Sequence, residues 1–289
     1  MALDLMIPEV WAARFLANLD KNLVFGNAIN RIYQPDAQYG NIVHVNKLGA
    51  ITIGDYTRNT PIGAPQILDA TDRPITIDQQ KFFNLYVDSV DEAQSRPDIM
   101  NEAMGRAAYA MADEVDKYLA SFYNNAVNKI GDSATPIVPN ATDIYQTLTE
   151  ASALLDEKNV PVDGRFMIMD PYNIKLLKDS GEMLSDTPSG DIVRTFGAFG
   201  GASGMLPNGY KGRIANFDIW MSNNLPTESA AEAIWIGGHP LGISFVDSLN
   251  SIEAYRPEQL FGDAVKGIYV YGAAAVLNDA LVAVYTARA

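Results

Sequence analysis

Two histidines, His44 and His239, are the residues that most readily suggest metal or acid–base chemistry in this sequence. They lie far apart in the chain, and no cysteine is present to add a ligand or a thiolate nucleophile. The sequence also lacks the G-x-S-x-G, H-E-x-x-H and calcium-loop motifs. We therefore expect structural roles for both histidines, and neither a metal ion nor a cofactor.

A glycine-rich stretch, GAFGGASG at residues 197–204, is the next candidate because such loops can cradle phosphates. A P-loop must end in Gly-Lys-Ser/Thr, so that the lysine reaches the phosphates and the hydroxyl reaches Mg²⁺. Here the run is followed by Met-Leu-Pro, and the next lysine is Lys211. The spacing also differs from the dinucleotide-binding pattern. We predict a surface loop in which Phe196 and Phe199 contact a partner.

Two acidic clusters could supply paired carboxylates for catalysis. In the cluster of Asp113, Glu114 and Asp116, Lys117 follows Asp113 by one helical turn, which favours an ion pair on a solvated helix face. The cluster at 88–92 is interpreted in the same way. Since no residue stands out as a nucleophile, a base or a metal ligand, we predict that the protein is not an enzyme.

The composition is that of a globular chain with an acidic excess. The 289 residues allow one large domain or two modest ones. The 35 acidic and 21 basic side chains give a formal charge of −14, so phosphate groups repel the chain and specific DNA or RNA binding is not expected. The absence of cysteine and of a secretory signal at the N-terminus favours a soluble, cytoplasmic protein.

The first half of the chain contains segments that look too long for a monomer. Residues 8–23 predict an amphipathic helix with Trp11 and Phe15 on one side, either an arm on another surface or an ordinary first helix. Residues 41–91 predict a long β-hairpin, with strands at IVHVNKL and AITIGDY, an irregular polar tip, and two more strands at RPITIDQQ and KFFNLYVDSV. Such a hairpin needs a surface to lie on, in its own domain or in a neighbour.

Residues 95–128 predict a helix of about 30 residues, or roughly 45 Å at 1.5 Å per residue. One apolar stripe runs along it, and acid-before-base pairs four residues apart lie opposite. The stripe consists of Met100, Met104, Ala107, Met111, Val115, Tyr118 and Phe122. A helix of this length indicates a rigid strut.

The second half reads as mixed helix and strand. We predict a helix over 142–158, a buried strand at RFMIMD, and a helix that Asp170 caps and Pro171 begins. Residues 261–289 contain an apolar run, but Asn278 and Asp279 stand in its middle and the residue types alternate. The tail therefore predicts a β-hairpin with two buried arms and a turn at LNDA, not a membrane span.

The order of these parts resembles the major capsid proteins of tailed bacteriophages, whose Hong Kong 97-type fold encapsulin shells share. The resemblance rests on MIPEVWAARFLANLDKNLVFGNAINRIY near the start, RFMIMDPYNIKLLKD in the middle and YRPEQLFGDAVKGIYVYGAAAVLNDALVAVY at the end. It covers nearly all of the chain and implies an α+β, Hong Kong 97-like capsid fold. The implied parts are an N-terminal arm (1–40), an E-loop hairpin (41–91), a peripheral domain with the spine helix (92–140), an axial domain (141–245) and peripheral return strands (246–289).

The resemblance also implies a function. The chain would be a major capsid protein that assembles as pentamers and hexamers into an icosahedral shell, enclosing double-stranded DNA without binding it specifically. Scaffolding, portal and decoration proteins are further implied partners, no membrane is involved, and the shell would assemble in the host cytoplasm and become part of the virion. The candidate interface residues are Trp11, Phe15, Arg58, Arg73, Phe196 and Phe199.

Some members of this family join subunits through a Lys–Asn isopeptide bond. Lys47, Lys81 and Asn278 lie in the corresponding regions, but no matching motif surrounds them, and we predict no crosslink. Two other functions stay open at this point. One is an encapsulin-like shell around a protein cargo, and the other is an α/β enzyme whose 141–245 unit binds a nucleotide.

Overall fold

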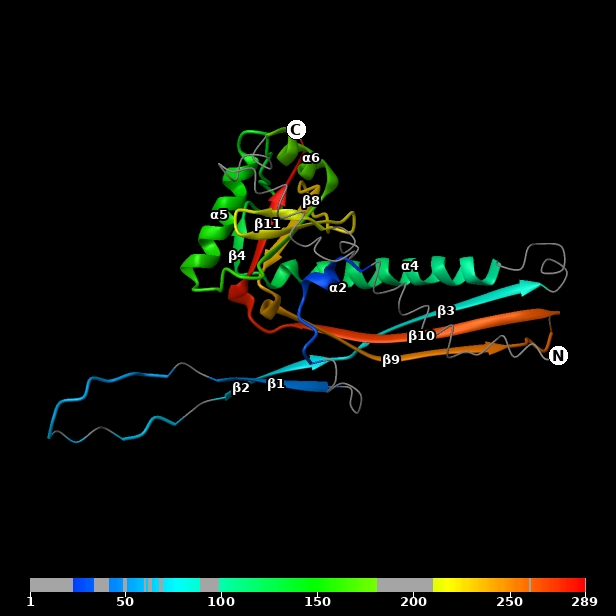
Figure 1. Ribbon diagram of the computed structural model, residues 1–289, viewed down its shortest axis with the longest axis horizontal. Coiled ribbons are helices and arrows are strands. Elements are labelled where there is room, and N and C mark those ends of the chain that lie inside the picture. The colour runs from blue at the N-terminus through cyan, green and yellow to red at the C-terminus, as the bar shows by residue number, and fades with distance from the viewer. Residues whose placement is uncertain are drawn as a thin grey trace, which may run out of the picture.

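The computed structural model describes residues 23–33, 42–48, 51–59, 61, 64–67, 70–88, 99–180, 210–259 and 261–288. Figure 1 shows three parts: an elongated layer in which a long helix lies along a three-stranded sheet, a compact unit above one end of that layer, and a hairpin that extends away from the same end.

The long helix α4 spans Ile99–Ala120. The predicted apolar stripe is confirmed at Met104, Met111 and Val115, which are buried. The predicted end at residue 128 is wrong, because the chain tightens into a 3₁₀ turn at Ser121–Asn125. Residues 95–98, which the prediction placed in the first turn, lie outside the described residues.

The three-stranded sheet is antiparallel and α4 packs on one of its faces. Its strands, in spatial order, are β3 (Gln79–Asp88), β10 (Gly262–Ala275) and β9 (Ile243–Tyr255). Tyr269 and Tyr271 of β10 are buried and join α4 in the largest apolar cluster, which continues into the compact unit at Ile168, Ile236 and Ala283.

The compact unit is built on a six-stranded mixed sheet. In spatial order the strands are β4 (Asn128–Ile130), β11 (Leu281–Thr286), β8 (Ala233–Gly238), β5 (Phe166–Met169), β7 (Phe217–Met221) and β6 (Tyr210–Ile214). The helices α5 (Ile144–Glu157) and α6 (Pro171–Asp179) pack with this sheet.

The two helices of the compact unit confirm their predictions. The four predicted inward side chains of α5 are fully buried. They are Ile144, Leu148, Ala151 and Leu155. At the start of α6 the Asp170 side chain accepts a hydrogen bond from the Asn173 backbone N–H, and Pro171 stands in the first turn.

The C-terminal tail is not the predicted hairpin. Its two arms, β10 and β11, are both strands and largely buried, but β10 pairs with β3 and β9 whereas β11 pairs with β4 and β8. The LNDA stretch forms a short 3₁₀ turn through which the chain passes from one sheet to the other. In the part of the chain that the structure describes, no helix is long and apolar enough to span a membrane.

The remaining hairpin consists of β1 (Ile42–Leu48) and β2 (Ala70–Thr76), which pair antiparallel over their full length. The predicted second strand at 50–56 is wrong, because residues 51–57 have no regular structure. Beyond β1 and β2 the chain forms a long open loop, while β3 leaves the hairpin and joins the three-stranded sheet (Figure 1).

Candidate interaction surface

The loop beyond β1 and β2, which we call the extension (residues 51–67), is exposed at every described position. Four of its large apolar side chains face solvent, with exposed fractions of 69% for Ile51, 94% for Ile53, 71% for Tyr56 and 86% for Ile67. Covering such groups would contribute about 25 cal/mol per Å² of apolar surface. A run of apolar side chains presented in this way marks a contact site for another molecule.

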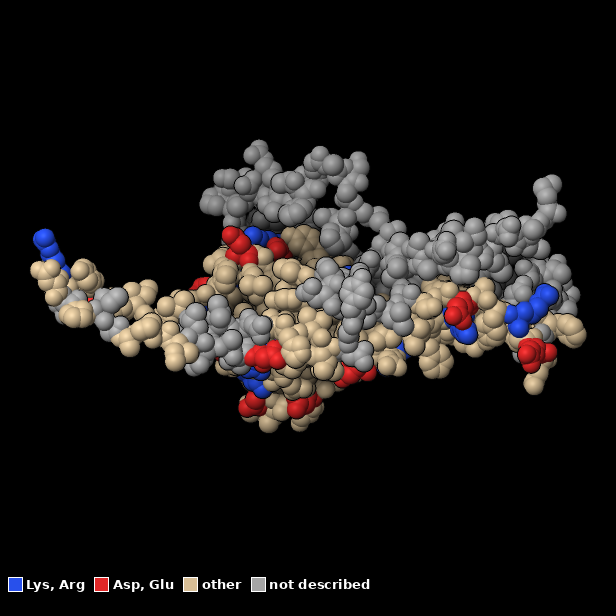
Figure 2. Space-filling model, turned by 90° about the horizontal axis from the view of Figure 1, so that it is seen from below, with Lys and Arg blue, Asp and Glu red and all other residues tan. Residues whose placement is uncertain are grey.

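The extension has little charge and few internal contacts. The Thr52 backbone N–H donates to the Gln66 side-chain oxygen at 2.8 Å and so ties its two sides together. A turn at Arg58 and Asn59 reverses the chain, with Asn59 at a left-handed φ of 64°, which asparagine tolerates. Figure 2 shows the basic group at the far end of this largely uncharged ribbon.

The root of the hairpin, in contrast, is held tightly against the core. Val43, Val45 and Ile75 are buried in a small cluster with Val246 of β9. A Cβ added to Gly272 of β10 would lie 2.2 Å from the Thr76 carbonyl oxygen and 2.7 Å from the Ile77 Cα. Backbone therefore lies directly on backbone where β2 crosses β10, and this contact fixes the direction in which the extension leaves.

The face of the three-stranded sheet that α4 leaves uncovered is a second contact candidate. Phe82 is 78% exposed there and, with Ile268, borders a cavity of about 320 Å³. The Lys266 ammonium pairs with Glu253 at 2.9 Å, and this hydrogen bond raises the pKa of Lys266. Exposed aromatic and charged side chains on one face are typical of protein–protein contacts.

Two of the six predicted interface residues lie in the described part of the chain. Arg58 is exposed on the extension and Arg73 is exposed on β2. Their role in subunit contacts stays a prediction. The other four, Trp11, Phe15, Phe196 and Phe199, lie outside the described residues.

Sequence reasoning missed the exposed apolar residues of the extension and Phe82. The signal was present in AITIGDY, whose alternation indicated a strand, but a strand needs a pairing partner and no described strand pairs with residues 51–57. In β3 the adjacent Phe82 and Phe83 point to opposite faces of the sheet. Phe83 therefore packs toward α4, whereas Phe82 is exposed on the other face.

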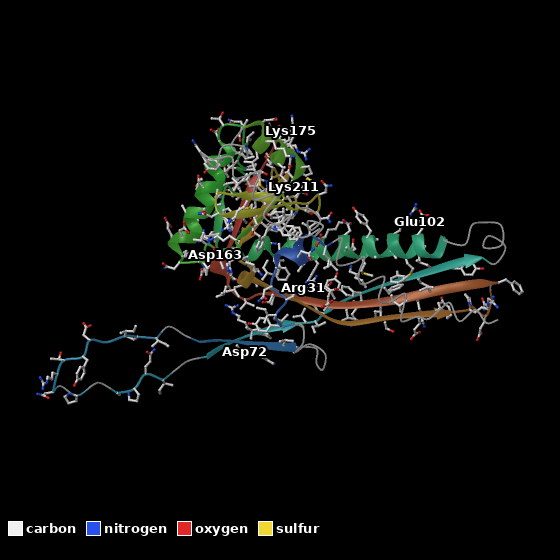
Figure 3. The ribbon with its side chains drawn as sticks, viewed as in Figure 1. Arg31, Asp72, Glu102, Asp163, Lys175 and Lys211 are labelled. Carbon is white, nitrogen blue, oxygen red and sulfur yellow. The ribbon has the colours of Figure 1, made fainter. Side chains whose placement is uncertain are left out.

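The histidines do not form a site. His44 pairs with Asp72 at 2.6 Å on the exposed hairpin, and Figure 3 labels Asp72 there. His239 accepts a hydrogen bond from the Leu241 backbone N–H, and partial burial lowers its pKa. Among the described residues, no three His, Cys, Asp or Glu side chains gather in a group that could hold a metal ion.

The Lys81 ammonium lies 3.4 Å from the Glu114 carboxylate of α4, and Asn278 begins the 3₁₀ turn between β10 and β11. The absence of an intersubunit crosslink stays a prediction.

The solvated-face interpretation of the second acidic cluster is correct for two members and wrong for Asp116. Asp113 and Glu114 pair with the Lys117 ammonium at 2.6 and 3.5 Å, whereas Asp116 is only 2% exposed. Asp116 lies next to Val115 and one turn after Ala112, on the buried side of α4. Its carboxylate accepts hydrogen bonds from backbone N–H groups, and burial raises its pKa to about 7.

The described part of the chain combines a folded body that has a buried core with an extended loop of exposed apolar side chains, features that are expected of a subunit of a larger protein assembly. Residues 70–286, well over half of the chain, match the family model described as phage capsid protein, and the chain belongs to this family. No curated protein matches it.

Solved structures extend the match to the fold. A structure from Mycobacterium phage Che8 is 26% identical and superposes with a TM-score of 0.69, over 91% of this chain and 90% of that chain. The capsid of the cyanophage P-SCSP1u is 18% identical, with a TM-score of 0.67 and coverage of 93% and 88%. A virus-like particle from Pyrococcus furiosus is 12% identical, with a TM-score of 0.58 and coverage of 98% and 100%, and shows the shared fold alone.

These findings confirm the predicted fold class and the predicted function. The chain is a major capsid protein of the tailed-phage type, a structural protein and not an enzyme, and it assembles with copies of itself into the icosahedral shell of the virion. The nucleotide-binding enzyme is thereby set aside.

Proposed function

We propose that copies of this chain join as pentamers and hexamers, and that each copy lays its extension on a neighbouring copy. The observation that carries the proposal is the exposure of Ile51, Ile53, Tyr56 and Ile67 on a ribbon that extends away from the body of the molecule. Obligate interfaces bury ~2,000–5,000 Å², and an extended ribbon supplies much area from few residues. The largely uncharged surface of the extension suits this role.

The same proposal assigns a part of the capsid fold to each segment of the chain. The N-terminal arm comprises 1–40, the E-loop 41–91, the peripheral domain 92–140 with 246–289, and the axial domain 141–245. The six-stranded sheet supports a modified boundary, because β4 and β11 pair with the strands of the axial unit. We assign the axial domain to the five- and six-fold axes of the shell.

The interior of the shell would hold double-stranded DNA without binding it specifically. A charge of −14 on each subunit repels phosphate, so retention of DNA depends on closure of the shell and not on affinity. Scaffolding, portal and decoration proteins are the proposed further partners, and assembly is proposed to take place in the host cytoplasm.

A double variant, Ile51→Asp with Ile53→Asp, tests the role of the extension. Two carboxylates buried in an apolar contact without partners cost several kcal/mol, so we expect the yield of closed particles to fall by roughly tenfold or more. Thermal unfolding of the unassembled subunit should stay unchanged, because both side chains are exposed there. Particles are counted by negative-stain electron microscopy, with and without a scaffolding protein.

The matched control is Ile51→Val with Ile53→Val, which keeps the apolar contact and should assemble normally. A normal particle yield from the aspartate variant would show that the extension is not an assembly contact. DNA protected from nuclease inside the particles, as opposed to a co-purified protein cargo, separates the phage head from a cargo shell.

A further inference from the structure

The connection between β9 and β10, of which the structure describes residues 256–259 and 261, forms one end of the three-stranded sheet. Figure 1 shows this end on the opposite side of the molecule from the extension. Phe261 there is 88% exposed, and among the described large apolar side chains outside the extension it is the most exposed. A single exposed apolar side chain is ordinary on a protein surface, so its surroundings decide whether it belongs to a contact site.

The aromatic residues near Phe261 lie on one face of the sheet. Tyr86 of β3 and Tyr255 of β9 are both directly opposite Ala264 of β10, so their rings stand on the same face. It is the face that α4 leaves uncovered, because the alternation along β3 places Phe82 there as well. Both tyrosines are exposed, while Ala264 between them is buried. We call Tyr86, Tyr255 and Phe261 the tip patch.

The charges beside the tip patch are balanced. The Lys266 ammonium pairs with Glu253 at 2.9 Å and lies 5.3 Å from the centre of the Tyr255 ring. Arg256 and Glu258, one of each sign, are exposed in the connection itself. A surface of this kind can be covered without burying an unpaired charge. Aromatic residues with balanced charges around them are typical of the centre of a protein–protein contact.

Side chains hold the backbone of the tip in place. The Tyr86 hydroxyl donates a hydrogen bond to the Phe261 carbonyl oxygen at 2.9 Å. The Asn84 side-chain N–H donates to the Tyr255 hydroxyl at 3.0 Å, which ties β3 to β9 across β10. The backbone is therefore fixed on both sides of the connection while the Phe261 ring stays in solvent. A ring presented from a fixed backbone loses little conformational entropy when it is covered, which favours binding.

A closed shell needs a second contact besides that of the extension. An extension laid on a neighbour joins different patches of the two copies, and such a heterologous contact is used up when the ring closes. Pentamers and hexamers must then be joined to one another through another surface. The tip patch lies at the far end of the molecule from the extension, so both surfaces can be in contact at the same time.

We propose that Phe261 is the centre of the contact that joins neighbouring rings: its side chain packs against a second copy in another pentamer or hexamer, and Tyr86 positions it. This inference rests on the proposed pentamers and hexamers, and it assigns the tip patch to a step that follows ring formation. Because each ring carries as many tips as it has copies, a loss at one tip is multiplied in the closed shell.

The first test compares free rings with closed particles for Phe261→Asp. Thermal unfolding of the subunit should stay unchanged, because the side chain is exposed there. The yield of closed particles should fall by roughly tenfold or more, while free pentamers and hexamers accumulate. Analytical ultracentrifugation separates the species and negative-stain electron microscopy counts the particles.

Phe261→Tyr keeps an aromatic ring at the tip and is the matched control, which should assemble normally. A normal yield of closed particles from Phe261→Asp overturns the proposal. Loss of the rings together with the particles also overturns it, because Phe261 would then belong to the contact within a ring.

A second test uses the absence of cysteine from the chain, since a single introduced thiol reports whether its position is covered. Phe261→Cys should react with a maleimide in free rings and roughly tenfold more slowly in closed particles. Ile53→Cys on the extension should react slowly in both. Equal reactivity of Phe261→Cys in rings and particles contradicts the present inference. Fast reaction of Ile53→Cys in both contradicts the proposed role of the extension instead, so the two failures are distinguishable.

Tyr86→Phe tests the positioning role, because it keeps the ring and removes the hydroxyl that donates to the Phe261 carbonyl. The yield of closed particles should fall by about two- to fivefold, the value of one hydrogen bond, with subunit unfolding unchanged. In the Phe261→Asp background the same substitution should cause no further loss, since residues that act through one contact are not additive. An unchanged yield from Tyr86→Phe, or a further loss in that background, overturns the positioning role.

Discussion

The compact unit and the hairpin with its extension use similar apolar residues in opposite ways. In the compact unit, β8 and β11 are buried at every position, and Trp235 even places its indole N–H on Asp170 at 3.2 Å. In the extension, Ile53 is 94% exposed and no described segment of the same chain covers it. One region is complete within a single copy and the other is not. Apolar content alone therefore does not locate a core, and a residue's partners do.

The largest expected effect lies in the compact unit. Trp235→Ala removes a fully buried ring and leaves Asp170 without that donor, so the free energy of unfolding of the subunit should fall by ~3–5 kcal/mol. Ile53→Ala on the extension should change it by less than about 0.5 kcal/mol. Urea unfolding of both unassembled variants measures the contrast. Trp235→Phe, which keeps most of the packing, should fall between them, and equal losses for Trp235→Ala and Ile53→Ala would remove the distinction between the regions.

A smaller effect is expected at the root of the hairpin, where the hairpin joins the folded body. Gly272→Ala places a methyl group on the Thr76 and Ile77 backbone, which cannot yield as a side chain does, at a cost of ~1–3 kcal/mol. The variant should also turn the hairpin root and reduce the particle yield by more than its stability loss explains. Gly54→Ala, on the extension itself with nothing within 4 Å, is the matched control and should leave subunit stability nearly unchanged. A Gly272→Ala subunit of normal stability would show that the root is not fixed by this contact.

The sequence predicted the elements whose signals are local. The Asp170–Pro171 start of α6 and the inward side chains of α5 follow from residues within one or two turns of each other. The separation of β10 from β11 could not be predicted, because LNDA suits a hairpin turn as well as a passage between sheets. What decides between them is that β3 and β8, both far away in the sequence, offer better partners.

The sequence predictions for Asp116 and for the extension were wrong for the same physical reason. Asp116 was predicted to be solvated and is buried, whereas the extension was predicted to be a paired strand and is exposed. A charged residue amid other acids predicts a solvated face unless a distant backbone segment is known to need its oxygens. An alternating apolar stretch predicts a strand unless no edge is available to pair with it. In both cases the missing information is the partner in space, and for the extension we propose that this partner belongs to a second copy of the chain.

The smallest expected effect concerns α4. It tests whether the open side of this helix contacts another copy of the chain in the shell, as we propose for the extension. Gly105 lies within the helix, and a Cβ there would meet nothing within 4 Å, so Gly105→Ala should raise the free energy of unfolding of the unassembled subunit by about 1 kcal/mol. Urea unfolding measures this gain, and a loss of stability would contradict it. Particle yield then sharpens the comparison. If assembly is unchanged, this side of α4 is as open in the shell as in the subunit. If assembly fails although the subunit is more stable, a neighbour approaches the helix at Gly105, and the incomplete surface of the molecule extends from the hairpin onto its longest helix.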